Sequence, residues 1–262
     1  MVATLVSIIL DAQNGNYPMG AKSTGMSHAN ITTFDEWALF NNPAGIGRIS
    51  SFSIATTYQS RFNINAFQTM GLAIHTPFEK FNAGIGIYRF GDDVYNQQKL
   101  NLAISSQIQL VSLGLGIHWV QNRFSEIGQI STVAFDFGGI AEIIKEFRIG
   151  AHLFNFTQSQ FTDQYLIPVT MKFGLNYVSE NHFQLTGEIE QQLNQPINFR
   201  FGLSYHFTNW ISFQSGFSTL TQSVSFGIGI HTNSWTFQYG YMNLHPAGTV
   251  HEFSLTKSFG KK

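Results

Sequence analysis

The sequence predicts an all-β fold, an antiparallel transmembrane β-barrel of about 14 strands with a plug formed by the N-terminal segment in its lumen. Three observations lead to this prediction: a side-chain period of two that recurs from residue 51 to residue 259, a charged fraction of only 11%, and glycines concentrated on one parity of the strands. Strands of a transmembrane barrel alternate in this way because one face meets lipid and the other meets water or a plug.

The alternation is clearest in the middle of the chain. Val169, Met171 and Phe173 fall on one parity, while Thr170 and Lys172 fall on the other, and the next two segments repeat the pattern. An even number of strands is usual for single-chain outer-membrane barrels. We expect strands near residues 51–59, 67–76, 81–90, 99–107, 111–120, 130–138, 146–155, 168–178, 182–191, 197–206, 210–218, 222–231, 234–242 and 249–259.

Composition argues against the other broad classes. Soluble domains carry roughly 25% charged residues, and a spanning helix needs about 18 to 20 unbroken apolar residues, which no window of this chain approaches. A soluble β-sandwich is the alternative, but every strand offers an apolar row that one small core could hardly cover. The formal charge of −1 excludes a polybasic nucleic-acid surface, and the absence of cysteine excludes disulfides and thiolate metal sites.

The chain divides into three expected parts. Residues 1–13 are interpreted as a signal peptide with a truncated or wrongly chosen start, because the apolar run 2–10 is short, Ala12 is a small residue near a cleavage point, and no Lys or Arg precedes the run. The alternative for these residues is a disordered or plug-associated terminus. Residues 14–50 are assigned to the plug, or hatch, and residues 51–262 to the barrel.

Glycines on the inward parity predict that something approaches the lumen wall closely. A barrel of this strand number encloses more space than its own side chains fill. The candidate is the segment from residue 14 to residue 49, whose Trp37, Leu39 and Phe40 have no apolar partner outside. The inward glycines are Gly71, Gly84, Gly86, Gly114, Gly116, Gly150, Gly174, Gly202, Gly216, Gly227, Gly229 and Gly240.

Three stretches carry a family resemblance. Residues 20–26 (GAKSTGM) and 35–45 (DEWALFNNPAG) resemble the opening of the FadL-like outer-membrane proteins, especially the PorV/PorQ branch associated with type IX secretion. Residues 136–155 resemble the mid-barrel pattern of that family, and residues 248–255 (GTVHEFSL) resemble its closing strand, although Glu252 stands where the family has Arg. The resemblance spans the whole mature chain and implies a fourteen-stranded barrel with a hatch in its lumen.

Three sets of residues are candidate sites. The hatch motif comprises Trp37, Phe40, Asn42, Pro43, Ala44 and Gly45, and the insertion signal comprises Phe253, Leu255 and Phe259 on one face of the last strand. A tight hairpin at 191–196 would bring Glu188 opposite Arg200 with Lys172 nearby. These three charges are expected to form an ion cluster in the lumen, and the alternative is that they are hydrated without partners.

The sequence offers no signature of a metal, cofactor or catalytic site. The histidines on the inward parity lie on separate strands and form no helical His pair, and no Ser/His/Asp arrangement stands out. The paired glycines lie inside strands and are not phosphate loops. We therefore expect no enzyme and no cofactor. The inward histidines are His75, His118, His152, His182, His206 and His231.

Two functions fit these expectations. The first is a non-enzymatic accessory of protein secretion or surface attachment, with outer-membrane lipid and the secretion machinery as partners. The second is a FadL-like transporter that carries small hydrophobic molecules across the bacterial outer membrane. The short external connections favour the first function, and the glycine-lined lumen is compatible with the second.

Overall fold

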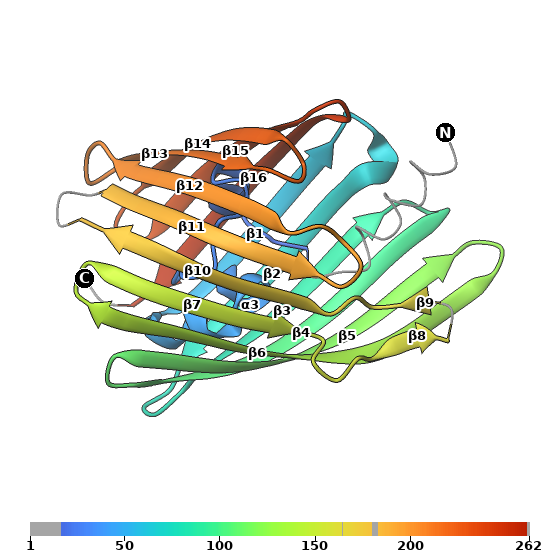
Figure 1. The fold of residues 1–262 in the computed structure, drawn as a ribbon, viewed down its shortest axis with the longest axis horizontal. Helices are drawn as coiled ribbons and strands as arrows, with labels where there is room; N and C mark the ends of the chain where they lie inside the picture. The colour runs from blue at the N-terminus through green and yellow to red at the C-terminus, as the bar shows by residue number, and fades with distance from the viewer. Residues whose placement is uncertain (1–16, 164, 180–182, 261–262) are drawn as a thin grey trace.

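Fourteen antiparallel strands of the described chain close into a barrel in the computed structural model (Figure 1). The structure describes residues 17–163, 165–179 and 183–260, so the predicted signal peptide, residues 1–13, lies outside the described residues. Each barrel strand pairs with its neighbours in chain order, and β1 closes the ring against β16. This topology confirms the predicted barrel of about 14 strands.

The strands alternate small hairpin turns with wider connections. Two further short strands, β8 and β9, form a separate two-stranded sheet. The bounds are β1 Phe52–Arg61, β2 Gln68–Pro77, β3 Asn82–Gly91, β4 Tyr95–Ile108, β5 Val111–Phe124, β6 Gly128–Ile144, β7 Phe147–Phe154, β8 Gln160–Thr162, β9 Tyr165–Leu166, β10 Thr170–Val178, β11 Phe183–Gln192, β12 Asn198–His206, β13 Ile211–Ser218, β14 Ser223–His231, β15 Trp235–Leu244 and β16 Gly248–Phe259.

The period of two in the sequence becomes the two faces of the wall. In β10 the outward side chains of Phe173 and Leu175 are 50% and 55% exposed, whereas the inward side chains of Lys172 and Asn176 are 3% and 1% exposed. The outward rows form the apolar surface that lipid covers. No helix in the described part of the chain is long and apolar enough to cross a membrane.

One side of the barrel extends further than the sequence pattern predicted. Strands β4 and β5 run several residues past the expected ends there, because beyond the lipid-facing band the ladder continues through polar residues and the hydrophobic alternation stops. Gln97 and Asn122, for example, are buried there, and the Gln97 amide donates a 3.0 Å hydrogen bond to Asn122 Oδ1. Strand β6 runs past its expected end mainly on the other side, through residues 139–144.

The connection between the predicted strands 146–155 and 168–178 contains regular structure of its own. The short hairpin of β8 and β9 occupies it, packing Phe161 and the buried Ile167 against the extended wall. Asn155 fixes the start of the connection, since its amide donates to Ile167 O over 2.7 Å and its Oδ1 accepts from the Ser159 N–H over 2.8 Å.

Residues 17–49, which we call the inner segment, run inside the barrel (Figure 1). They contain two short α-helices, α2 Ala21–Gly25 and α3 Ala38–Asn41, and the 3-10 helix η1 Pro43–Arg48, which leads into β1. A second 3-10 helix, η2 Asn65–Phe67, lies in the connection between β1 and β2. The inner segment contacts β13 to β16 through α2 and β3 to β6 through η1.

The two ends of the barrel differ. At the terminal end, where β1 begins and β16 ends, adjacent strands are joined by short turns such as those at residues 109–110 and 145–146. The wider connections, including residues 155–169, lie at the opposite end, which we call the distal end. Outer-membrane barrels keep their short turns in the periplasm and their long loops outside. By that rule the distal end faces the cell exterior.

A closed barrel that satisfies its backbone hydrogen bonds internally should resist detergent. We therefore expect unboiled protein to migrate faster than boiled protein on an SDS gel. Identical mobility of the two samples, together with purification as a detergent-independent monomer, would contradict the closed barrel.

Candidate functional site: the segment inside the barrel

The inner segment follows the circumference of the lumen, so that it meets glycines on strand after strand. A Cβ built on any of these glycines would press against a specific atom of the inner segment. The contacts are those of Ala21 with Gly240, Gly25 with Gly227, Met26 with Gly216 and Gly202, Ile31 with Gly174, Thr32 with Gly150, Asn42 with Gly138, Pro43 with Gly114, Leu39 with Gly86 and Met19 with Gly71.

The closest approaches are between backbones. A Cβ on Gly216 would clash with the carbonyl group of Met26, and a Cβ on Gly114 would clash with the peptide that joins Pro43 to Ala44. The opposing atoms cannot move aside by a change of rotamer, because they belong to the main chain. Most of the inward glycines are therefore required by the path of the inner segment. The exceptions are Gly116 and Gly229, where an added Cβ would meet side chains of the wall itself.

The buried carboxylate of Glu252 on β16 holds the start of the inner segment. Its Oε1 accepts hydrogen bonds from the Gly20 N–H at 2.9 Å and from the Thr57 hydroxyl at 2.8 Å. Its Oε2 accepts from the Gln59 amide at 3.0 Å and from the Thr24 hydroxyl. The residue is fully buried, and four donors satisfy its charge without an ion-pair partner among the described residues.

Sequence reasoning missed this role of Glu252. It treated the residue only as a departure from the family pattern at the closing strand. The signal that was available is its parity, because an acidic residue between Val250 and Ser254 on the inward face of the last strand must find donors inside the barrel. Neighbouring Ser254 adds a second attachment, accepting the Ala21 N–H at 2.9 Å.

A second buried carboxylate, Glu188 on β11, holds the middle of the inner segment. Glu188 Oε2 accepts the backbone N–H groups of Asn30 and Ile31 at 3.0 Å and 2.9 Å. Its other oxygen lies 3.3 Å from Arg200 Nη1 on β12, so the guanidinium compensates the charge from the wall side. The carboxylate thus joins the inner segment to the barrel through both of its oxygens.

The predicted ion cluster has four members in the structure. The register pairs Glu188 with Arg200 and Lys172 with Glu190. Arg200 also bonds to Glu190, and Lys172 Nζ lies 3.4 Å from the same carboxylate. All four side chains are largely buried, and two acids face two bases. Glu190, which the prediction left out of the cluster, is the residue that links Lys172 to Arg200.

The hatch motif forms the turn at which the inner segment returns to the wall. Asn42 Nδ2 donates to Ile31 O at 2.7 Å, and Asn42 Oδ1 accepts the Ala44 N–H at 3.2 Å. Pro43 begins η1, where its missing N–H costs no hydrogen bond. Gly45 packs so closely on Thr33 that a Cβ would clash with the Thr33 carbonyl oxygen.

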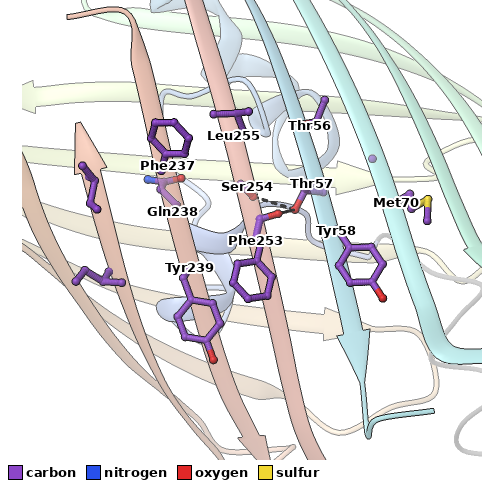
Figure 2. A pocket seen from close by; sticks show the side chains of 13 residues that line it. Thr56, Thr57, Tyr58, Met70, Phe237, Gln238, Tyr239, Phe253, Ser254 and Leu255 are labelled. Atoms are coloured by element: carbon purple, nitrogen blue, oxygen red, sulfur yellow. Dashed lines mark hydrogen bonds between the residues drawn. The ribbon is translucent and has the colours of Figure 1, made fainter. Parts of the chain in front are cut away.

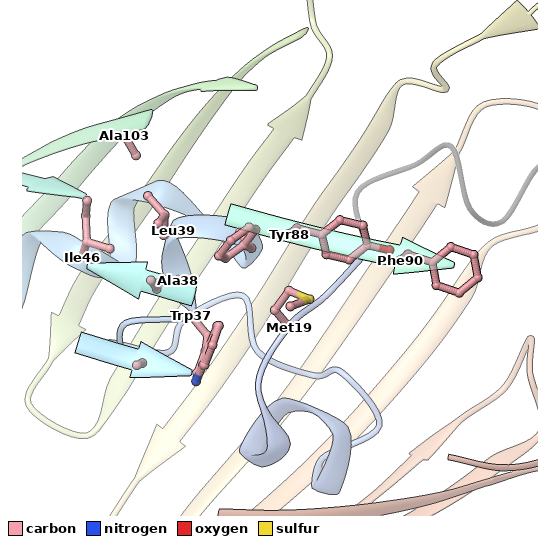
Figure 3. Close-up of a cluster of buried hydrophobic side chains, with 11 residues drawn as sticks. Met19, Trp37, Ala38, Leu39, Ile46, Tyr88, Phe90 and Ala103 are labelled. Atoms are coloured by element: carbon pink, nitrogen blue, oxygen red, sulfur yellow. The ribbon is translucent and has the colours of Figure 1, made fainter. Parts of the chain in front are cut away.

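The aromatic residues of the hatch motif lie in an apolar core between the inner segment and strands β1 to β4 (Figure 3). Trp37 and Phe40 are 2% and 3% exposed, and their ring centroids lie 6.2 Å apart. The wall contributes Ala55, Ala73 and Ala103 to this core, small residues that leave room for the rings. The core therefore belongs to the contact between segment and wall.

The residues of the expected insertion signal lie on the opposite face of the wall. Figure 2 shows Tyr239, Phe253 and Tyr58 on the neighbouring strands β15, β16 and β1, and the strand register pairs them directly. Phe253 and Phe259 are 55% and 46% exposed, and Leu255 lines a shallow outer groove with Phe253. These residues contact lipid and are not brought near the inner segment.

Two of the inward histidines share one carboxylate. His118 Nε2 lies 2.9 Å from Asp136 Oδ1, and His152 Nε2 lies 2.7 Å from Asp136 Oδ2, with all three groups buried on β5, β6 and β7. In the described residues, no group of three or more His, Asp or Glu side chains is placed to hold a metal ion. His182 lies outside the described residues.

Comparison with protein families and solved structures yields two findings. A family model described as "Type IX secretion system membrane protein PorP/SprF" matches residues 24–256. Among solved structures, the chain resembles a Pseudomonas aeruginosa FadL homologue, with 10% identity, 92% of this chain and 98% of that chain covered, and a TM-score of 0.68. It also resembles the P. putida toluene transporter TodX, with 10% identity, 93% and 99% coverage, and a TM-score of 0.69.

At 10% sequence identity, these two structural similarities establish only the fold. No curated protein matches the chain in sequence.

The attachment through Glu252 predicts the effect of an isosteric change. In Glu252→Gln an amide NH₂ replaces one acceptor oxygen and faces donors, so we expect a loss of roughly 1 to 3 kcal/mol in the free energy of unfolding. The N-terminal part of the inner segment should also open more often. Thermal unfolding and the rate of trypsin cleavage after Lys22 measure the two effects.

The matched control is Glu126→Gln, which removes the same charge from an exposed position between β5 and β6. If Glu252→Gln and Glu126→Gln behave alike in both assays, the carboxylate does not anchor the inner segment.

The ion cluster predicts a larger effect from charge reversal. Arg200→Glu leaves three acids facing Lys172, and breaking a buried ion pair costs roughly 3 to 5 kcal/mol. We expect a clearly lower melting temperature than that of the control Arg123→Glu, which reverses an exposed charge near the end of β5. A melting temperature unchanged from the wild type would show that these charges act independently.

Proposed function

The chain belongs to the PorP/SprF family of type IX secretion system membrane proteins, and we propose that it works there as a permanently plugged barrel, a non-enzymatic accessory of secretion or surface attachment. It is an outer-membrane β-barrel. Its partners in this proposal are outer-membrane lipid and proteins of the secretion machinery that dock on its exposed surfaces. The motifs at residues 20–26 and 35–45 extend the proposal to a role like that of the PorV/PorQ branch.

The observation that carries the proposal is the attachment of the inner segment to two buried carboxylates. Withdrawing the segment would remove the Gly20 and Thr24 donors from Glu252 and the Asn30 and Ile31 donors from Glu188. Each hydrogen bond to a charged group contributes roughly 1.5 to 3 kcal/mol, and the abandoned acceptors would stay buried. An open state reached in this way should be rare.

Polar side chains of the wall hold the later part of the inner segment as well. The carbonyl oxygen of Ala44 accepts the Ser112 hydroxyl at 2.6 Å, and Asn82 Nδ2 donates to Ile46 O at 2.9 Å. Near the segment's last residues, Arg48 pairs with Glu142 of β6. Attachment is therefore distributed along the segment, and this supports a plug over a gate that swings from one hinge.

Transport of small hydrophobic molecules is the second candidate. A cavity of about 700 Å³ at the distal end favours it, because a ligand could enter there from outside. Passage through the lumen would then require the inner segment to move. The two candidates thus differ in one physical requirement, which a covalent lock can test.

Ser27 and Ser225 provide the position for the lock. Their hydroxyl oxygens lie 2.8 Å apart, one on the inner segment and one on β14, and the chain has no cysteine of its own. The double variant Ser27→Cys/Ser225→Cys should form a disulfide, since the side chains already meet. We expect the oxidised variant to support type IX secretion as well as its reduced form does in cells that lack the native protein.

The single variant Ser27→Cys, which cannot form the bond, controls for the substitution itself. Loss of secretion or of hydrophobic-compound uptake only in the oxidised double variant would show that the inner segment must move. The permanently plugged barrel would then be wrong.

A further inference from the structure

The distal cavity lies between the first described residues of the inner segment and the strand ends of the wall. Tyr17 and Pro18 form one side, and residues at the distal ends of β1 and β10 to β15 form the others. Its volume of about 700 Å³ is large enough for a few amino-acid residues. Two arginines line it, Arg61 on β1 and Arg200 on β12, and each is only 8% exposed.

The two arginines differ in their partners. Arg200 is paired with Glu188 and Glu190. Arg61 has no ion-pair partner among the described residues: its Nε donates to the neutral amide of Gln59 at 2.6 Å, and its Nη2 has no hydrogen-bond partner. A buried guanidinium without a counter-charge is costly, and a negatively charged ligand would remove that cost.

Aromatic rings hold the Arg61 guanidinium in place. Its carbon Cζ lies 3.7 Å from the ring centroid of Tyr17 and 5.2 Å from that of Phe90. Stacking fixes the plane of the guanidinium, and Gln59 engages its Nε–H group, so an anion in the cavity would meet Arg61 as one fixed positive charge. The side chain is therefore preorganised.

Three cations act on His28, which lines the cavity. Burial, reinforced by Arg200, Lys172 and Arg61, holds the pKa of His28 well below its usual range, so this lining residue stays neutral near pH 7. The acids that face the cavity are already engaged, because Glu190 is bonded to Arg200 and paired with Lys172. Arg61 reaches an acid only indirectly, because Gln59 bridges it to the buried carboxylate of Glu252.

The rest of the lining suits a peptide. Amide and hydroxyl groups of Gln192, Gln195 and Thr221 line the cavity, where main-chain amides can bond, and Phe62, Phe67 and Leu244 add apolar surface.

We propose that the distal cavity binds the C-terminal carboxylate of an apolar peptide, with Arg61 as its counter-charge. The peptide's last side chain packs on Phe62 and Phe67, and its main chain bonds to the amide and hydroxyl groups opposite. The choice of a protein ligand rests on the proposed function. Binding is measured on the purified protein without secretion, so the binding proposal and the proposed function can be contradicted separately.

The test uses the purified, detergent-solubilised barrel and a fluorescein-labelled peptide, Gly-Ser-Gly-Leu-Phe, with either a free carboxylate or a C-terminal amide. Fluorescence anisotropy should show binding of the free acid and at least about tenfold weaker binding of the amide, as expected for loss of a charge-assisted pair. This arm needs no mutation, so misfolding cannot explain its result.

Variants assign the effect to Arg61. Arg61→Gln should weaken binding of the free acid about tenfold or more, while Arg123→Gln, which neutralises an exposed arginine near the same end of the barrel, should leave it unchanged. Heat-dependent gel mobility checks that each variant is folded. The proposal is overturned if the acid and the amide bind equally, if neither binds, or if Arg61→Gln binds like the wild type. Tight binding of dodecanoate with no binding of the peptide would assign the cavity to a fatty acid instead.

Discussion

The whole interior depends on the close approach of one backbone to another. Where the inner segment passes, the wall has glycine, and at Gly114 and Gly216 the opposing atoms are main-chain atoms. So close a fit shuts out water, so the polar groups of the segment must bond to the wall instead. The serines, asparagines and carboxylates on the inward face follow from that requirement.

The two buried carboxylates both attach the inner segment to the wall, but their negative charges are stabilised in different ways. Glu252 is surrounded by neutral donors, and no cation of the described residues pairs with it. Glu188 shares its charge with Arg200, and through Arg200 with Glu190 and Lys172. The first arrangement resembles an anion bound by amides and hydroxyls, and the second is a compensated ion cluster. Together they attach the beginning and the middle of one short segment, which has little regular structure of its own.

The sequence predicted what depends on local periodicity. Strand parity was enough to place Gly174 and Lys172 on the inner face, and counting across the hairpin placed Glu188 opposite Arg200. Local periodicity could not predict contacts between distant parts of the chain. Gly20 and Glu252 are separated by 232 positions, and the sequence around each residue does not indicate that the two make contact. The β8–β9 hairpin depends likewise on how loops and lumen fill three-dimensional space, and so does the lack of an ion-pair partner for Arg61 among the described residues.

The central claim is that the inner segment closes the barrel, and conductance in planar bilayers tests it most directly. The intact protein should be silent, whereas a variant lacking residues 14–41 that still shows heat-dependent gel mobility should conduct ions, because most of the inner segment would be gone. Steady conductance of the intact protein, unchanged by the deletion, would contradict the account.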